Sequence, residues 1–272
     1  MLLALDVGNT NVTVGAFEGK RLARQWRQET RTDIGAGILG RDLASAAKRH
    51  GVRVDSAVYG SVVPGLNRTL EEAVRQRFGC RALAVTPRSR LGMRLKVKTP
   101  LEVGADRILN ALAAFELAKG PAVVIDFGTA TTFDCVSKRG DYLGGAILPG
   151  PRMAAKALAS GTAQLPEIAV RRPRRVIGRN TKECIEAGLY FGYLGMIERI
   201  LGMTLAEMKR AGSGPRIVST RLLRSAARKS VCQPCHVQGP VCAAPRSVST
   251  VLNVNGVPSL LVSIATLLVP PS

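Results

Sequence analysis

The stretch LLALDVGNTN at residues 2–11 is matched in form by AVVIDFGTAT at residues 122–131. Each copy has an apolar run of strand length, then Asp, a spacer, Gly and a cluster of small hydroxyl or amide residues. A buried strand that ends in Asp-x-Gly presents a carboxylate at its edge, and the Gly lets the next backbone N–H groups approach an anion. A single copy would favour a simple hairpin turn. The duplication instead predicts two facing loops that hold a nucleotide triphosphate and its metal.

The length and composition indicate a globular α/β protein. A chain of 272 residues is long enough for one large domain or two ordinary ones, and the repeat favours two related halves. Hydrophobic residues make up 46% and aromatic residues only 4%, so the cores must consist of Ala, Val, Leu and Ile. Alternating strand and helix patterns predict a mostly parallel sheet with helical cover. The first residues read as a core strand rather than a secretory signal, which predicts a cytoplasmic location and no membrane partner.

The strongly basic charge is compatible with more than one kind of partner. The formal charge of +20 predicts attraction to phosphate-bearing molecules but does not separate ATP from nucleic acid. Five arginines concentrate between Arg171 and Arg179. No aromatic residues interleave with them to stack on bases, so a solvated loop is favoured and nucleic-acid binding is not expected.

The segment TPLEVGADRILNALAAFELAKG, residues 99–120, carries the clearest helix signals. Thr99 is expected as the N-cap, Pro100 as the first helical residue and Glu102 as the partner in a capping box, with Gly120 as the stop. A buried stripe is expected on this helix at Ile108, Leu109, Leu112 and Phe115. Asp106 and Asn110 then lie one turn apart on a different face.

Phosphoryl transfer is the chemistry that these residues suit. Asp6 and Asp126, at the ends of equivalent strands, would hold cations around the phosphates, and the backbone from Gly8 onward would bind phosphate oxygens. Asp106 is the candidate base for an attacking hydroxyl, and Arg107 the candidate ligand for an anionic group of the acceptor. The alternative for Asp106 and Arg107 is an exposed helix pair.

Three glycine features remain open from the sequence alone. Gly104, near a helix start, suggests that a ligand approaches the backbone there. The run YLGGAILPGP, residues 142–151, reads either as part of a site or as a plain hairpin. Gly188, Gly192 and Gly195 recur on a helix that follows Asn180-Thr181, and they would permit close packing with a second subunit or with another helix of the same chain.

Several motifs in this order resemble the type III pantothenate kinases. They are DVGNTN at 6–11, SVVP at 61–64, PLEVGADRILNA at 100–111, DFGTATTFD at 126–134, LGGAILPG at 143–150 and GRNTKECIEAGL at 178–189. The resemblance covers residues 1 to about 218. It implies a duplicated ribonuclease-H-like, actin-like ATPase fold with mixed sheets flanked by helices, with domains at 1–115 and 116–219.

The resemblance also implies ATP-dependent phosphorylation of pantothenate, the first step of coenzyme A synthesis. Members of the family are cytoplasmic homodimers that need ATP, a divalent cation such as Mg²⁺, and K⁺ or NH₄⁺. By position, Asp106 becomes the general base, Asp126 the ligand of the monovalent cation, and Asp6 a divalent-cation ligand through water. The implied phosphate loop comprises Asp6, Val7, Gly8, Asn9, Thr10, Asn11, Val12 and Thr13, with Thr129 as a further ATP contact. The implied pantothenate site comprises Gly104, Ala105, Asp106, Arg107 and Thr181.

The chain departs from the family pattern in three places. Residues 85–93 stand where members have a GPG-containing turn, and Val97 stands where some have Tyr. After residue 220 the family's Gly-Gly turn is missing, and residues 208–272 contain no Asp or Glu. We interpret residues 220–272 as an atypical tail that arises from a change of reading frame.

The cysteines are expected to be reduced. Cys80, Cys135 and Cys184 are predicted to be core residues. The tail residues Cys232, Cys235, His236 and Cys242 offer patterns for haem attachment or zinc binding, but the spacing supports neither well. No Ser-His-Asp triad is expected, because His50 and His236 lie outside the motifs.

Two other functions remain as alternatives from the sequence. One is a basic nucleic-acid-binding or transcriptional accessory protein of the same family. The other is a related small-molecule kinase that acts on a different hydroxyl.

Overall fold

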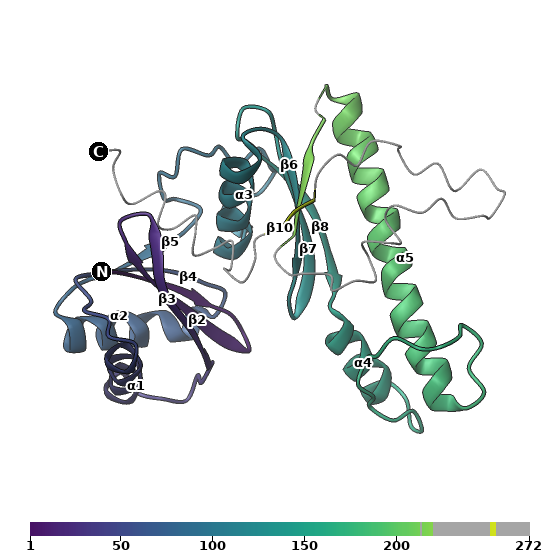
Figure 1. Cartoon of the computed structure of the whole chain (residues 1–272), viewed down its shortest axis with the longest axis horizontal. Helices are drawn as coiled ribbons and strands as arrows, with labels where there is room; N and C mark the ends of the chain where they lie inside the picture. The colour runs from purple at the N-terminus through teal and green to yellow at the C-terminus, as the bar shows by residue number, and fades with distance from the viewer. Residues whose placement is uncertain (213, 220–250, 254–272) are drawn as a thin grey trace.

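The computed structural model describes residues 1–212, 214–219 and 251–253, and these form two five-stranded sheets flanked by helices (Figure 1). The first sheet contains β1 (Leu2–Val7), β2 (Asn11–Glu18), β3 (Arg21–Glu29), β4 (Ser56–Ser61) and β5 (Ala82–Val85), in the order β3-β2-β1-β4-β5. The second contains β6 (Ala122–Phe127), β7 (Ala130–Val136), β8 (Tyr142–Pro149), β9 (Arg216–Ser219) and β10 (Val251–Asn253), in the order β8-β7-β6-β9-β10. The two sheets therefore repeat one strand order.

The prediction of mostly parallel sheets is wrong. The first three strands of each sheet pair antiparallel, and parallel pairing begins only where a helix intervenes, at β1–β4 and β6–β9. Both Asp-x-Gly segments open a hairpin, because the N–H of Gly8 donates to Asn11 O at 3.0 Å and that of Gly128 to Ala130 O at 2.9 Å. A short turn can only join antiparallel neighbours. The hairpin interpretation and the duplication thus both hold.

One helix, α3 (Ala105–Ala118), lies between the two sheets (Figure 1). The other helices are α1 (Ala36–Arg49), α2 (Pro64–Phe78), α4 (Pro151–Ser160) and α5 (Thr181–Arg210). On the outer faces, α1 and α2 cover the first sheet and α5 covers the second, whereas α4 follows the end of β8 and packs beside α5. Ile108 and Leu112 of α3 pack on the first sheet, whereas Ala114 and Ala118 pack on the second. Burial on both sides explains why α3 is apolar around most of its circumference.

The N-terminus of α3 differs from the prediction. Thr99, Pro100 and Glu102 belong to a separate 3₁₀ turn, η1 (Pro100–Glu102), in which the Thr99 hydroxyl donates to Glu102 at 2.9 Å. The α-helix begins at Ala105 with Gly104 as its N-cap. Val103 is extended, which separates the two helical segments. Of the predicted stripe, Ile108, Leu109 and Leu112 are buried as expected, whereas Phe115 is only half-buried.

Three further segments that the sequence analysis singled out are the run at 142–151, the start of the helix after Asn180, and the glycines along that helix. Residues 142–149 form strand β8, and Asn180 caps α5 by accepting a hydrogen bond from the Glu183 N–H at 2.9 Å. A Cβ added at Gly188, Gly192 or Gly195 would meet no described atom within 4 Å, so packing within the described part of the chain does not explain these glycines.

Cys135 is buried as predicted, but Cys184 is exposed near the start of α5. Within the part of the chain that the structure describes, no helix is long and apolar enough to span a bilayer. Within residues 220–272, only β10 belongs to the described residues. The predictions for this tail, including those for Cys232, Cys235, His236 and Cys242, therefore lie outside the described residues.

Candidate functional site

Strand alternation directs both repeated aspartates toward α3. In β1, Ala4 packs on α3 while Leu3, Leu5 and Val7 face α1 and α2, so Asp6 shares the side of Ala4. In β6, Val124 packs with α3 residues while Val123 and Ile125 face α5, so Asp126 shares the side of Val124. The two carboxylates therefore end their strands on the faces that enclose α3.

The loops that follow the two aspartates meet directly. The hydroxyl of Thr10 lies 3.3 Å from the hydroxyl of Thr129. Thr30 holds the first loop, since its hydroxyl donates to Gly8 O at 2.6 Å and its N–H to Thr10 O at 3.0 Å. In the second loop Gly150 donates its N–H to Thr129 O at 3.0 Å. The two exposed threonines thus join the predicted phosphate-binding loops.

Asp106 is the second residue of α3, and its carboxylate turns back over the start of the helix. The backbone N–H of Arg107 donates to Oδ1 of Asp106 at 2.8 Å. A Cβ at Gly104 would lie 2.4 Å from the same oxygen. The lack of a side chain at Gly104 therefore leaves room for the Asp106 carboxylate. From the sequence we had expected it to leave room for a ligand. A helix N-terminus also favours a negative charge here.

The carboxylates of Asp6, Asp106 and Asp126 lie close enough for their charges to affect one another. Partial burial, followed by the charges of Asp126 and Asp106, raises the pKa of Asp6 to about 7. Burial also raises the pKa of Asp106, and the charge of Asp126 adds to that rise, while the Arg107 N–H opposes it. Such mutual repulsion is the arrangement that a cation or a transferred proton relieves.

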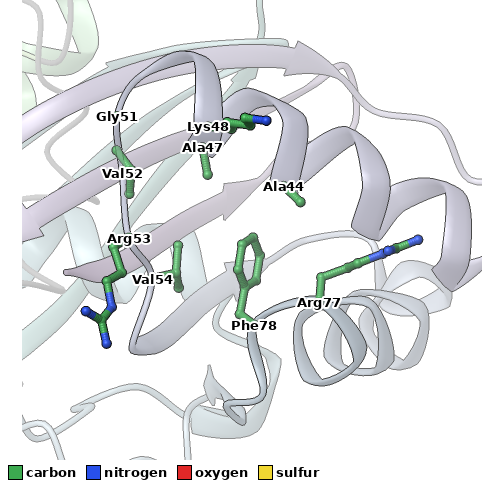
Figure 2. Close-up of a pocket in the computed structure, with 9 residues that line it drawn as sticks. All are labelled: Ala44, Ala47, Lys48, Gly51, Val52, Arg53, Val54, Arg77 and Phe78. Atoms are coloured by element: carbon green, nitrogen blue, oxygen red, sulfur yellow. The ribbon is translucent and has the colours of Figure 1, made fainter.

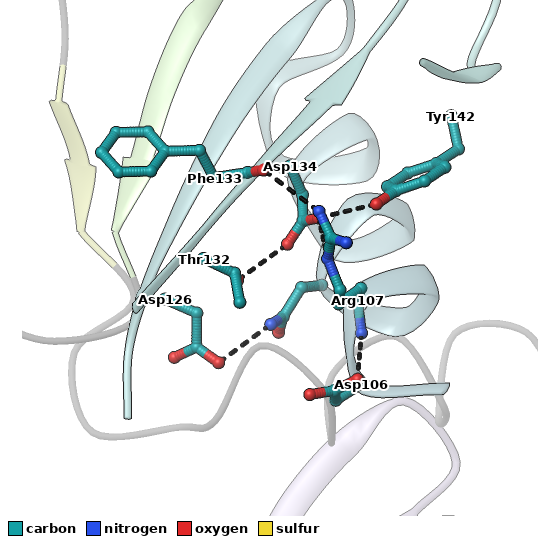
Figure 3. A network of polar contacts seen from close by, with 8 residues as sticks. Asp106, Arg107, Asp126, Thr132, Phe133, Asp134 and Tyr142 are labelled. Atoms are coloured by element: carbon teal, nitrogen blue, oxygen red, sulfur yellow. Dashed lines mark hydrogen bonds and ion pairs between the residues drawn. The ribbon is translucent and has the colours of Figure 1, made fainter. Parts of the chain in front are cut away.

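Asp126 and Arg107 each have a defined partner (Figure 3). The amide nitrogen of Asn110 donates to Oδ2 of Asp126 at 3.1 Å, which ties the end of β6 to α3. Arg107 extends from α3 to β7, where its Nε donates to Oδ1 of Asp134 at 2.7 Å. Tyr142 donates to the same carboxylate oxygen at 2.9 Å. Arg107 is thus not an exposed helix residue, and the exposed-pair alternative is wrong for it.

The predicted phosphate-loop residues differ in how far they are exposed. Asn9 and Thr10 are exposed, and Gly8 and Asn11 are half-buried. The side chains of Val7, Val12 and Thr13 are buried. Only backbone groups of these three are therefore suited to contact a nucleotide. A Cβ at Gly8 would lie 3.1 Å from Asn11 O, so a side chain there would crowd the turn.

Thr181 lies apart from the other predicted site residues. It is the first residue of α5 and lines an apolar hollow beside α4 with Leu158, Leu165 and Ile185. In Figure 1 this end of α5 is well separated from α3. Ala105, by contrast, is buried at the first turn of α3 beside Asp106.

A second hollow opens between α1 and α2, lined by Lys48, Arg53, Arg77 and Phe78 among others (Figure 2). It lies on the face of the first sheet that α1 and α2 cover, opposite the face on α3. It therefore contributes nothing to the cluster of carboxylates.

The side chains of Asp6 and Asp126 suit cations whose other ligands are phosphate oxygens and water. Among the described residues, no three His, Cys, Asp or Glu side chains come close enough to hold a metal ion by themselves. Mg²⁺ commonly keeps several waters and takes one or two carboxylates together with substrate phosphates. Asp6 and Asp126 supply carboxylates of that kind beside the hydroxyl loops.

Sequence reasoning missed Asp134, Thr132 and Tyr142. Thr132 and Asp134 alternate with apolar Phe133 and Cys135 along β7, so two polar side chains fall on the face toward α3. Polar residues at alternate positions of a fully buried strand are a signal that the sequence does contain.

Comparison with known proteins assigns the family. The model of the type III pantothenate kinase family matches residues 2–202. A type III pantothenate kinase of Anaeromyxobacter dehalogenans is 46% identical over 223 residues, covering 81% of this chain and 87% of that protein. One of Moorella thermoacetica is 44% identical over 211 residues, covering 76% and 83%.

A solved structure supports the fold. The Lmo2764 protein of Listeria monocytogenes matches with a TM-score of 0.54 at 12% identity, covering 97% of each chain. This likeness concerns fold alone, and together with the repeated strand order it confirms the duplicated ribonuclease-H-like architecture. The family match and the close relatives lead to one conclusion: the chain belongs to the type III pantothenate kinase family.

Proposed function

We propose that this chain transfers the γ-phosphoryl group of ATP to the primary hydroxyl of pantothenate, giving 4′-phosphopantothenate and ADP. The hydroxyl oxygen attacks the γ-phosphorus while the bond to the β,γ-bridging oxygen breaks. The hydroxyl proton passes to the carboxylate of Asp106. Family membership supports the substrates, because the relatives bear the name of this activity.

One observation carries the chemical part of the proposal. The carboxylate of Asp106 lies at the start of a helix enclosed by two sheets, within the field of the aspartates that end β1 and β6. Burial raises its pKa, which makes it a better proton acceptor at neutral pH. Its partner Arg107 offers a cation for the carboxylate of the acceptor.

The cofactors of this proposal come from the family resemblance, and the carboxylates near the two loops support them. Asp6 would hold a divalent cation such as Mg²⁺ through water, and Asp126, supported by the Asn110 amide, would hold K⁺ or NH₄⁺. When bound, the cations neutralise charge on the phosphates. The proposed phosphate loop runs from Asp6 to Thr13 with Thr129 opposite, and the proposed acceptor site comprises Gly104, Ala105, Asp106 and Arg107. Thr181, which lies apart from these residues within one chain, is included only because the family resemblance implies it.

The organisation of the protein belongs to the same proposal. We expect domains at 1–115 and 116–219, although residue 115 falls within α3. We also expect a cytoplasmic homodimer. The open glycines of α5, Gly188, Gly192 and Gly195, and the exposed Met196 and Met203 support a subunit contact along that helix.

The decisive experiment measures ADP release with pantothenate, MgATP and K⁺. Wild-type protein should turn over, and Asp106→Asn should lower kcat by about 10²- to 10⁴-fold with an unchanged circular dichroism spectrum. Glu116→Gln, an exposed substitution on the same helix, should leave kcat unchanged. Turnover of other hydroxyl acceptors but not of pantothenate would favour a different small-molecule kinase. Salt-dependent duplex binding without turnover would favour the nucleic-acid alternative.

A further inference from the structure

Asp134 is a fully buried carboxylate with three side-chain donors around it. It lies on β7 with no exposed surface. Its Oδ1 accepts from Nε of Arg107 at 2.7 Å and from the Tyr142 hydroxyl at 2.9 Å, and its Oδ2 accepts from the Thr132 hydroxyl at 3.0 Å (Figure 3). Buried charges are stable only when paired in this way. The site is therefore built to hold an ionised carboxylate against one particular arginine.

The guanidinium of Arg107 is fixed from several sides. Its Nη2 donates to Phe133 O at 3.4 Å, and its Cζ lies 5.8 Å from the centre of the Tyr142 ring. A Cβ at Gly145 would lie 3.2 Å from Nη2 of Arg107 and 1.7 Å from Phe133 O. Only glycine at this position therefore leaves room for the Arg107 side chain beside β7. The Arg107 side chain retains 16% of its surface exposed.

The hydrogen bonds of Arg107 are distributed unevenly. Nε and Nη2 face β7, while Nη1 has no hydrogen-bond partner among the described residues. In Figure 3 the guanidinium also lies at some distance from the Asp106 carboxylate, at the other end of the arginine side chain. An acceptor that carries a hydroxyl at one end and an anion at the other would extend between these two groups.

We propose that Asp134 is a positioning residue that holds Arg107 by Nε, so that Nη1 stays directed to the carboxylate of the acceptor. The proposal rests on the proposed function, in which Arg107 binds that carboxylate. A flexible arginine that is fixed before binding loses less freedom when the acceptor arrives. Tyr142 and Thr132 in turn fix Asp134.

When Asp134 is neutralised, the loss of its negative charge and the loss of a fixed position for Arg107 have opposite effects on the binding of the acceptor. Asp134→Asn removes a negative charge close to Arg107, and on charge alone an anionic acceptor would then bind more tightly. If position dominates, the loosened guanidinium binds the acceptor carboxylate less well. We expect position to dominate, because a bidentate or charge-assisted hydrogen bond depends on a fixed donor geometry.

The test compares two acceptors. Steady-state kinetics are measured with pantothenate and with its primary amide, which keeps the hydroxyl but lacks the negative charge. For Asp134→Asn the KM for pantothenate should rise about tenfold, equivalent to about 1.4 kcal/mol. The kcat, the KM for ATP and the KM for the amide should stay within about twofold. Tyr142→Phe, which removes one donor to Asp134, should give the same pattern at about threefold.

Cys135→Ala is the matched control, since this buried neighbour on β7 faces the opposite side of the sheet. It should lower stability without changing the KM for pantothenate relative to the amide. A fall in the pantothenate KM of Asp134→Asn, or equal changes for both acceptors, overturns the positioning role while the kinase function stands. If Asp134→Asn fails to fold, Tyr142→Phe decides by the same criterion. Absence of turnover in the wild type overturns the proposed function and this inference together.

Discussion

The hydroxyl of Thr10 lies 3.3 Å from that of Thr129, although 119 residues separate them in the chain. Each follows an Asp-x-Gly turn, so the contact joins equivalent points of the two repeats. The two sheets reach this approach because α3 lies between them and fixes their separation. The two loops thus form one surface, and this is the surface on which we propose that the polyphosphate of ATP binds.

Removal of the Thr129 hydroxyl should weaken ATP binding. Thr129→Val keeps the shape but removes a hydrogen-bonding group from the second loop, so the KM for ATP should rise about tenfold with a smaller change in the KM for pantothenate. Thr129→Ser should stay near wild type. Thr32→Val, in an exposed segment before α1, is the control. An unchanged KM for ATP in Thr129→Val would contradict a role of this hydroxyl in the nucleotide site.

Asp6 is expected to reduce the stability of the protein while serving its activity. Its partly buried charge is repelled by Asp126 and Asp106. In the presence of EDTA, Asp6→Asn should raise the free energy of unfolding by about 1 kcal/mol, and with MgATP it should lower kcat at least about 100-fold. Urea unfolding and ADP release measure the two effects. Exposed Asp33→Asn should change neither, and a destabilised Asp6→Asn would argue against repulsion among these carboxylates.

Gly104 is expected to control the position of the Asp106 carboxylate. In Gly104→Ala the new Cβ would meet Oδ1 of Asp106 at 2.4 Å, whereas the backbone at φ −59° and ψ 143° accepts alanine without strain. The side chain of Asp106 should turn away, and kcat should fall about 10- to 100-fold with little loss of stability. Gly37→Ala on α1, where a Cβ meets open space, is the matched control. Wild-type kcat in Gly104→Ala would show that the observed carboxylate position is not required.

The buried carboxylate of Asp134 should make stability depend on pH. Burial raises its pKa to about 6, against the opposing effects of Arg107, Tyr142 and Thr132. The folded state then binds a proton that the unfolded state releases between pH about 4 and 6, so the free energy of unfolding falls as pH rises through this window. The contribution is at most about 3 kcal/mol.

Urea unfolding in EDTA at pH 4.5 and 7 checks this dependence. The decline from the lower to the higher pH should be smaller in Asp134→Asn than in the wild type, because asparagine does not titrate. An identical decline in both proteins would assign the pH dependence to other groups.

Several predictions succeeded because they depend on local pattern. The repeated strand, the buried stripe of Ile108 and Leu112, and the helix after Asn180 all follow from side-chain periodicity or from signals within one turn. The predicted start of this helix at Pro100 was wrong for α3, because the Thr99 and Glu102 signals belong to a separate 3₁₀ turn and α3 begins at Ala105. Local signals identify a turn but do not decide whether the helix continues beyond it.

By itself, the sequence determined the duplicated Asp-x-Gly turns, the motifs that place the chain in its family, and the candidate base Asp106. These depend on residue types at short spacing. The tertiary structure alone decided that Arg107 pairs with Asp134, that Thr10 meets Thr129, and that Thr181 lies apart from Asp106. Such relations depend on how α3 packs between two sheets, and this packing brings together strands from distant parts of the chain that no local pattern relates.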